Sequence, residues 1–335
     1  MIKFSNGRAI NYFIASGALA YDCKGWLHER ALTALGFINP RFFAVAIKSL
    51  TLPPTAGHLV WWHPWTCIRM IQNGAVNKVG LTNPGFNWWV TRVAPYIDFE
   101  SQPVIVSLFG SPEDLVYMAE RLNPFDLLAI EVNGSCPNKK LLTSGLPQSL
   151  REQAEHIAQA TIAAKTVSRH PFIQKVSYEQ AYFYLESRLR GVVEAISINS
   201  VKHETVFPDE QSPLCRLENR VGGGGGGVSG KPAQLYNWKV VSDLKREGKT
   251  PIIAPSSMSY EDMQYVRNEL GADGVSFGTI MLPDHNPFKV WTWLTNPTKP
   301  TRYVRRAQRE QIAAVIKQQK AEADEAEQAH KLESE

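Results

Sequence analysis

Short apolar runs alternate with longer stretches of mixed polarity along most of the chain. The runs are continuously apolar, a pattern typical of parallel strands that are buried on both faces. Strands are therefore expected at residues 10–15, 42–47, 104–108, 127–132, 172–176, 195–198, 251–254 and 275–277.

The stretches between these runs carry helix signals. Ser111 suits an N-cap, Pro112 the first helical position, and two acids follow in the first turn, which predicts a helix to about residue 122. Longer helices are expected at 149–167 and 232–247, the second with Gly248 as its C-cap. Another is expected at 260–270.

Repeated strand–helix alternation predicts an α/β fold with a parallel sheet covered by helices. About eight such units favour a closed (β/α)8 barrel, and a doubly wound open sheet is the alternative. The barrel is expected to span residues 1–304. Residues 305–335 are rich in Ala, Gln, Glu and Lys, so a charged helical or frayed tail is expected there.

Composition narrows the function. The chain has 335 residues, 44% of them apolar and 20% charged, which excludes disorder throughout. A net charge of +4 spread over this length favours a small-molecule ligand over nucleic acid. No apolar run is long enough for a membrane span, and the N-terminus lacks a secretory signal, so a cytoplasmic protein is expected. The four cysteines lack CxxC spacing, which predicts reduced thiols and no metal site.

Polar groups follow most of the predicted strands. Functional side chains of a (β/α)8 barrel lie at the carboxyl ends of its strands. Taken singly, a lysine there is usually solvated, an asparagine forms a turn, and a cysteine is an inert small side chain. Together they predict one site, formed by Lys48, Asn133, Cys136, Asn138, Lys175 and Asn199.

A run of glycines at 222–227 has two interpretations. It is either a flexible linker or a backbone segment that approaches a phosphate closely. Its place before the seventh strand favours the phosphate, because the last loops of such barrels often bind one. Ser256, Ser257, Gly278 and Thr279 would complete the phosphate site.

Several segments, in order from about residue 10 to 290, resemble motifs of the flavin-dependent dihydroorotate dehydrogenases. They cover most of the chain, and their number and order make the resemblance specific. The segments are Ala15-Ser16-Gly17, Lys48-Ser49-Leu50-Thr51-Leu52, residues 77–85 (NKVGLTNPG), residues 133–138 (NGSCPN), Ile198-Asn199-Ser200-Val201, residues 226–230 (GGVSG) and Phe277-Gly278-Thr279.

The resemblance implies an FMN-binding barrel that oxidises dihydroorotate to orotate in pyrimidine synthesis. It implies that Cys136 is the base that removes the C5 proton while a hydride passes from C6 to FMN. Residues 139–147 are interpreted either as a lid that closes over this site or as an ordinary loop. The implied substrate-binding residues are Lys48, Asn77, Val79, Gly80, Leu81, Asn133, Asn138, Asn199 and Ser200. The implied FMN-binding residues are Ala15, Ser16, Gly17, Lys48, Ser49, Asn133, Lys175, Asn199, Gly226, Gly227, Ser256, Ser257, Gly278 and Thr279.

A cysteine base resembles the soluble class of the family, in which a homodimer is expected. Fumarate, NAD⁺ through a partner electron-transfer subunit, and a quinone are all open as acceptors. The chain departs from the family at the turn 254–257, where glycines are usual, at the Trp-rich segment 61–65, and at 209–227.

Two other functions remain open. Residues 136–140 (CPNKK) also fit an element of the tRNA dihydrouridine synthases, another group of FMN barrels that act on a dihydropyrimidine. The tail is too short for the RNA-binding domain expected of that group. A decayed flavoprotein without activity is the other alternative.

Overall fold

The structure is a computed structural model that describes residues 1–36, 39–60, 62–134, 150–184, 189–215, 225–282, 290 and 294. Eight parallel strands close into a barrel, which confirms the (β/α)8 prediction over the open sheet. In order around the barrel they are β3 (Tyr12–Ile14), β4 (Ala44–Ala46), β7 (Val104–Leu108), β8 (Ala129–Asn133), β9 (Phe172–Val176), β10 (Ala195–Ile198), β13 (Ile252–Ala254) and β14 (Gly274–Phe277).

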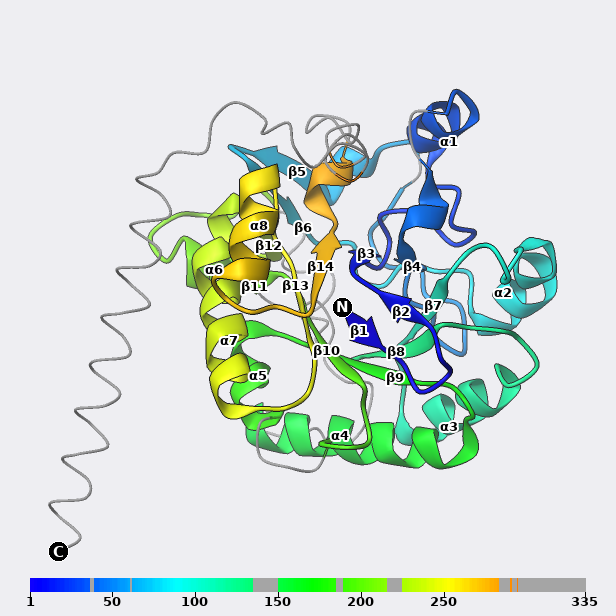
Figure 1. The fold of residues 1–335 in the computed structure, drawn as a ribbon. Helices are drawn as coiled ribbons and strands as arrows, with labels where there is room; N and C mark the ends of the chain where they lie inside the picture. The colour runs from blue at the N-terminus through cyan, green and yellow to red at the C-terminus, as the bar shows by residue number, and fades with distance from the viewer. Residues whose placement is uncertain are drawn as a thin grey trace, which may run out of the picture.

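Helices surround the strands (Figure 1). Ser111 caps α3 (Pro112–Arg121) as expected, since its Oγ accepts from the Asp114 N–H at 3.2 Å. Ser259 caps α8 (Tyr260–Asn268) in the same way, since its Oγ accepts from the Asp262 N–H at 3.1 Å. The helices are α1 (Leu27–Ala34), α2 (Phe86–Arg92), α3 (Pro112–Arg121), α4 (Leu150–Val167), α5 (Tyr178–Tyr184), α6 (His203–Val206), α7 (Gln234–Glu247) and α8 (Tyr260–Asn268).

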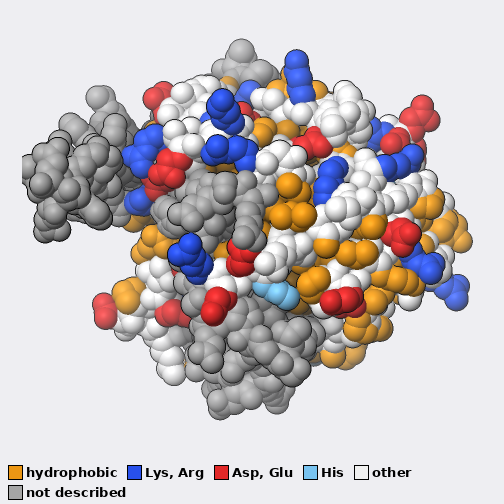
Figure 2. All heavy atoms as spheres, turned by 90° about the horizontal axis from the view of Figure 1, so that it is seen from below, with side chains coloured by type: hydrophobic (Ala, Val, Ile, Leu, Met, Phe, Trp, Pro, Cys, Tyr) orange, Lys and Arg blue, Asp and Glu red, His pale blue; other side chains and the backbone are white. Residues whose placement is uncertain are grey.

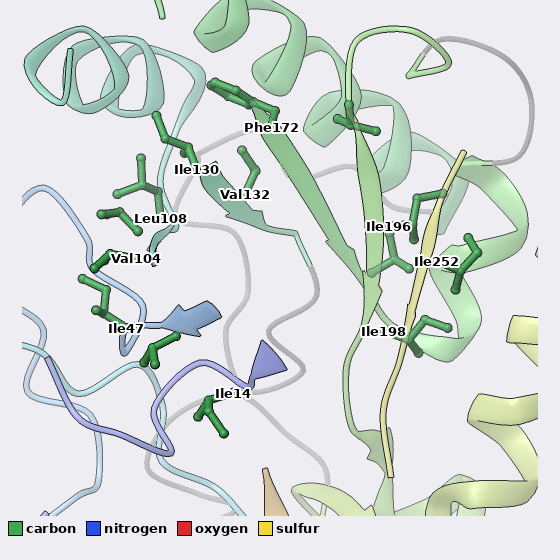
Figure 3. Packing of buried hydrophobic residues seen from close by; sticks show 14 of the residues in the cluster. Ile14, Ile47, Val104, Leu108, Ile130, Val132, Phe172, Ile196, Ile198 and Ile252 are labelled. Atoms are coloured by element: carbon green, nitrogen blue, oxygen red, sulfur yellow. The ribbon is translucent and has the colours of Figure 1, made fainter. Parts of the chain in front are cut away.

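Alternate residues of the barrel strands face opposite sides. One set forms the larger apolar cluster, between strands and helices; Figure 3 shows Ile130, Phe172 and Ile196 among its members. The other set forms a smaller cluster that includes Ala129 and Ile173. Because these residues alternate with the first set, they fill the interior of the barrel.

A hairpin covers the amino ends of the barrel strands. Its strands are β1 (Ile2–Lys3) and β2 (Ala9–Ile10). Ile2 and Phe4 join the interior cluster, where strand residues such as Ala44 are small. Asn6 donates to the carbonyl of Leu128, just before β8, at 3.0 Å. This end of the barrel is therefore closed by apolar packing, and the opposite, carboxyl end is the one available for a site.

A second, antiparallel sheet has the strand order β11 (Val201–Lys202), β12 (Gly227–Gly230), β6 (Gly74–Asn77) and β5 (Ile68–Ile71). The sequence did not predict it. Asn73, with φ +56°, ends the short turn between β5 and β6. The sheet brings together two chain segments about 150 residues apart.

Several predicted boundaries were wrong. The run 10–15 is two strands, because β2 pairs with β1 while β3 starts at Tyr12 and enters the barrel. Residues 40–42 form a 3₁₀ turn, so β4 begins at Ala44. Gly248 is the C-cap of α7 as expected, although its φ of −116° is extended rather than left-handed. The predicted tail, 305–335, lies outside the described residues.

Charges of both signs are interspersed on the face seen in Figure 2. Lys and Arg side chains lie among Asp and Glu side chains there, as a small net charge leads one to expect. None of the helices in the described ranges has the length and apolarity that a membrane crossing requires.

Candidate active site

The loops after β3 and β4 meet at the carboxyl end of the barrel. Ser16 Oγ donates to the Ile47 carbonyl at 2.9 Å and lies 3.1 Å from Ser49 Oγ. Ala15 N–H donates to the Phe277 carbonyl at 2.9 Å, which fastens this loop to the end of β14. Gly17 has φ +91°, and a methyl group there would lie 3.7 Å from Lys48 Cγ. The predicted residues of these two loops are thus brought together.

A polar network crosses the barrel interior below these loops. Ser49 Oγ lies 2.8 Å from Ser107 Oγ and accepts from Asn133 Nδ2 at 2.9 Å. Ser107 Oγ donates to Glu131 Oε1 at 2.8 Å, and Lys175 Nζ lies 3.5 Å from the same oxygen. The network therefore links the loop after β4 to β7, β8 and β9 through buried polar side chains.

Sequence reasoning missed Ser107 and Glu131. Glu131 is only 4% exposed and lies between two apolar residues of β8. A buried carboxylate needs a partner, and that requirement was a readable signal. Lys175 lies one strand away and supplies the partner.

Two buried cations lie at this end of the barrel among the residues that the structure describes. Lys48 and Lys175 are 8% and 7% exposed, and Glu131 is the carboxylate among them. Burial raises the pKa of Cys67 to about 11, although the Lys48 ammonium acts to lower it. A positively charged, water-poor region of this kind favours an anionic ligand.

The second sheet carries another group of predicted residues to the barrel mouth. Asn77 Nδ2 donates to the Gly227 carbonyl at 3.4 Å, and the two residues are register partners of β6 and β12. Gly226 has φ +95°, and a methyl group there would come within 2.7 Å of the Asn77 carbonyl oxygen, so only glycine fits. Asn199 and Ser200 lead directly from β10 into β11 of this sheet.

The loop after β6 turns sharply. Gly80 and Leu81 both have positive φ, +67° and +60°. Asn83 holds the turn, because its Nδ2 donates to the Leu81 carbonyl at 2.7 Å while its Oδ1 accepts from the Gly85 N–H at 2.9 Å. The Val79 carbonyl accepts from the His58 N–H at 2.9 Å. Hydrogen bonds therefore fix the backbone expected to face the substrate carboxylate.

The turns after β13 and β14 lie side by side, because these strands are neighbours in the barrel. Ser256 has φ +69°. Ser257 is 2% exposed, and its Oγ lacks a hydrogen-bond partner within the described part of the chain. Gly278 lies against the first loop, since a methyl group there would be 3.2 Å from Ala15 Cβ. Thr279 begins a 3₁₀ turn.

Three predicted features lie outside the described residues. They are Cys136 with Asn138, the lid at 139–147, and residues 222–224 of the glycine run. The chain leading to Cys136 is held firmly up to Gly134, whose N–H donates to the Lys175 carbonyl at 3.2 Å. Gln180 Nε2 donates to the Gly134 carbonyl at 3.0 Å. Cys136 therefore follows, after one residue, a backbone fixed beside Lys175.

Comparison with known proteins identifies the family. Residues 13–277 match the family model described as dihydroorotate dehydrogenase. The chain belongs to the dihydroorotate dehydrogenase family. The matched range runs from β3 to the end of β14 and so covers the whole barrel.

Curated relatives agree with this assignment. The catalytic subunit of dihydroorotate dehydrogenase B (NAD(+)) from Geobacter sulfurreducens is 30% identical over 63% of this chain and 66% of its own length. The same subunit from Thermoanaerobacter pseudethanolicus is 28% identical over 70% and 74%. An Aeropyrum pernix protein, named for the fumarate-type dihydroorotate dehydrogenase A, is 31% identical over 64% and 67%. The chain thus spans about two thirds of the length of these relatives.

The family match confirms the prediction of a dihydroorotate dehydrogenase, an oxidoreductase. It runs against the tRNA dihydrouridine synthase alternative, because the dihydroorotate dehydrogenase model covers the whole barrel. The individual roles of the site residues stay predictions. The names of the relatives divide between fumarate and NAD⁺ as the electron acceptor.

Proposed function

We propose that this protein oxidises dihydroorotate to orotate with bound FMN, as a step of pyrimidine synthesis. The observation that carries the proposal is the convergence of Ser49, Asn133 and Lys175 on one buried network at the carboxyl end of the barrel, with the buried Lys48 next to Ser49 in the chain. The second sheet adds two more of the predicted substrate-binding residues, because Asn77 ends β6 and Asn199 leads into β11 of the same sheet.

The residues present fit FMN. Ser257 Oγ is a buried hydroxyl that lacks a protein partner among the described residues, and a phosphate oxygen would supply one. Gly226 and Gly278 are closely packed by neighbouring atoms and have no side chains, so a phosphate could approach their backbone directly. When bound, FMN supplies the acceptor for the two electrons that leave the substrate with the C6 hydride.

The substrate chemistry matches the side chains. The carboxylate of dihydroorotate would take a charge-assisted hydrogen bond from Lys48. Asparagine amides offer donors and an acceptor, which suits a ring with two carbonyls and two N–H groups. Cys136 would remove the C5 proton as a thiolate. A free thiol has a pKa of about 8.5, and nearby lysine charge lowers it. Lys175 would lie against the flavin ring.

The test is reduction of the purified protein without oxygen. We expect a flavin absorbance band that bleaches when dihydroorotate is added. Dihydrouracil, which lacks the carboxylate, is the matched control and should bleach the band far more slowly. A flavin band that dihydroorotate leaves unchanged would refute the substrate, and a protein that takes up no FMN would refute the cofactor.

By resemblance to the family we also infer a cytoplasmic homodimer, with a separate electron-transfer subunit if NAD⁺ is the acceptor. Mixing the reduced protein with fumarate, NAD⁺ or a quinone identifies the acceptor as the compound that restores the flavin band. Size-exclusion chromatography with light scattering tests the dimer.

A further inference from the structure

The turn after β13 has a backbone conformation that serine rarely adopts. Ser256 has φ +69°, in the left-handed region that favours glycine. Such a residue persists only where its surroundings hold it in place. The contacts around Ser256 must therefore hold it in this conformation, and the fold alone does not explain why a serine is placed there.

Three side chains of α7 donate hydrogen bonds to this turn. Gln234 Nε2 donates to the Ser256 carbonyl at 2.8 Å, and Asn237 Nδ2 donates to Ser256 Oγ at 3.1 Å. Trp238 Nε1 donates to the Pro255 carbonyl at 3.0 Å. The three residues are spaced to share one face of the helix, and each is 1% exposed.

The turn is held from α8 as well. Asp262 Oδ2 accepts from the Met258 N–H and from Gln234 Nε2, both at 2.9 Å. Hydrogen bonds thus fix the residues on both sides of Ser257. Ser257 itself is buried, and within the described ranges its hydroxyl makes no hydrogen bond.

We propose that Asn237 and Gln234 are positioning residues that hold the strained Ser256 turn so that the Ser257 hydroxyl donates to the phosphate of FMN. This inference rests on the proposed function, because FMN is the ligand that brings the phosphate. Asn237 binds the side chain that makes the turn unfavourable. Its contribution should therefore disappear when residue 256 is glycine.

The experiment is a double-variant cycle on FMN affinity. Apoprotein is titrated with FMN, and quenching of flavin fluorescence gives the dissociation constant. Asn237→Ala should weaken FMN binding about tenfold, the usual effect of one lost hydrogen bond. In a Ser256→Gly background the same substitution should change the affinity less than about twofold, since glycine adopts positive φ unaided.

Riboflavin supplies a second readout, because it lacks the phosphate. Asn237→Ala and Ser257→Ala should weaken FMN binding and leave riboflavin binding unchanged. Asn268→Ala is the matched control; Asn268 lies at the exposed end of α8, where its amide contacts Gln264 at 3.1 Å. Thermal unfolding of each apoprotein shows whether the variant is folded at the temperature of titration.

The outcomes separate the two proposals. If Asn237→Ala lowers FMN affinity equally in the wild-type and Ser256→Gly backgrounds, or in neither, the positioning role is overturned. A loss of riboflavin affinity as large as that of FMN would overturn it as well. A wild-type chain that binds no FMN would instead overturn the proposed function, and this inference with it.

Discussion

Neutralising Glu131 should destabilise the protein, because it leaves the Lys175 ammonium buried without its carboxylate. Both side chains are buried, and Nζ of Lys175 lies 3.5 Å from Oε1 of Glu131. At an effective dielectric constant of about 20, that separation gives an attraction of roughly 5 kcal/mol. Desolvation of both ions offsets most of this, yet breaking one side of a buried pair costs about 3–5 kcal/mol.

The substitution Glu131→Gln isolates the charge. Glutamine keeps the shape and an acceptor for the Ser107 hydroxyl, so the change acts chiefly on the Lys175 contact. We expect a loss of about 3 kcal/mol in the free energy of unfolding of the apoprotein, measured by urea denaturation at pH 7. Lys175→Met alone should cost a similar amount, since it leaves the carboxylate unpaired.

The double variant, Glu131→Gln with Lys175→Met, tests whether the two charges are coupled. With both charges removed, no ion is left unpaired, and the stability should return to within about 1 kcal/mol of the wild type. Additive losses in the double variant would refute the coupling between Glu131 and Lys175. Even a fully stable double variant should bind or reduce FMN poorly, because Lys175 is proposed to contact the flavin.

Three further predictions test other parts of the chain. Cys136→Ala should lower turnover of dihydroorotate at least about hundredfold while the visible flavin band persists, the usual effect of losing a catalytic base. Burial raises the pKa of Cys67 to about 11, so iodoacetamide at pH 8 should label partly exposed Cys215 and spare Cys67 until urea unfolds the protein, as peptide mass spectrometry would show. Burial lowers the pKa of His170 below 6.5, so the folded protein binds the proton less readily than the unfolded chain does. The urea midpoint of unfolding should therefore fall on acidification below about pH 6.5. It should fall less in His170→Gln, which has no group that titrates at this position.

The barrel could be predicted from the sequence because its strands are buried on both faces. The predicted bounds of β7, β9 and β10 agree with the structure. Burial on both faces makes most residues of each strand apolar, with few polar residues such as Ser107 and Lys175, and local pattern reading detects such runs. The first strand was predicted wrongly, because one apolar run supplies two strands, β2 of the hairpin and β3 of the barrel.

The second sheet is largely invisible to local pattern. The Asn73-Gly74 dipeptide, at the end of the turn and the start of β6, is a hairpin signal that a closer reading could have used. Strand β11 has only two residues and pairs with β12, which begins and ends with glycine. The pairing of β12 with β6 joins residues about 150 positions apart. That pairing brings Asn77 to Gly227, and the sequence motifs alone suggested only that both belong to one site.

The distribution of polar groups inside the barrel argues for a site independently of the motifs. Apolar side chains such as Phe13 and Ile173 pack at the amino end, whereas Ser107, Glu131 and Lys175 lie toward the carboxyl end. Well-packed apolar residues in place of a buried ion pair are often as stable or more stable. Stability therefore gives no reason for this polar layer, and ligand binding does. Removing both charges, of Glu131 and of Lys175, should therefore spare the fold and still impair the flavin chemistry.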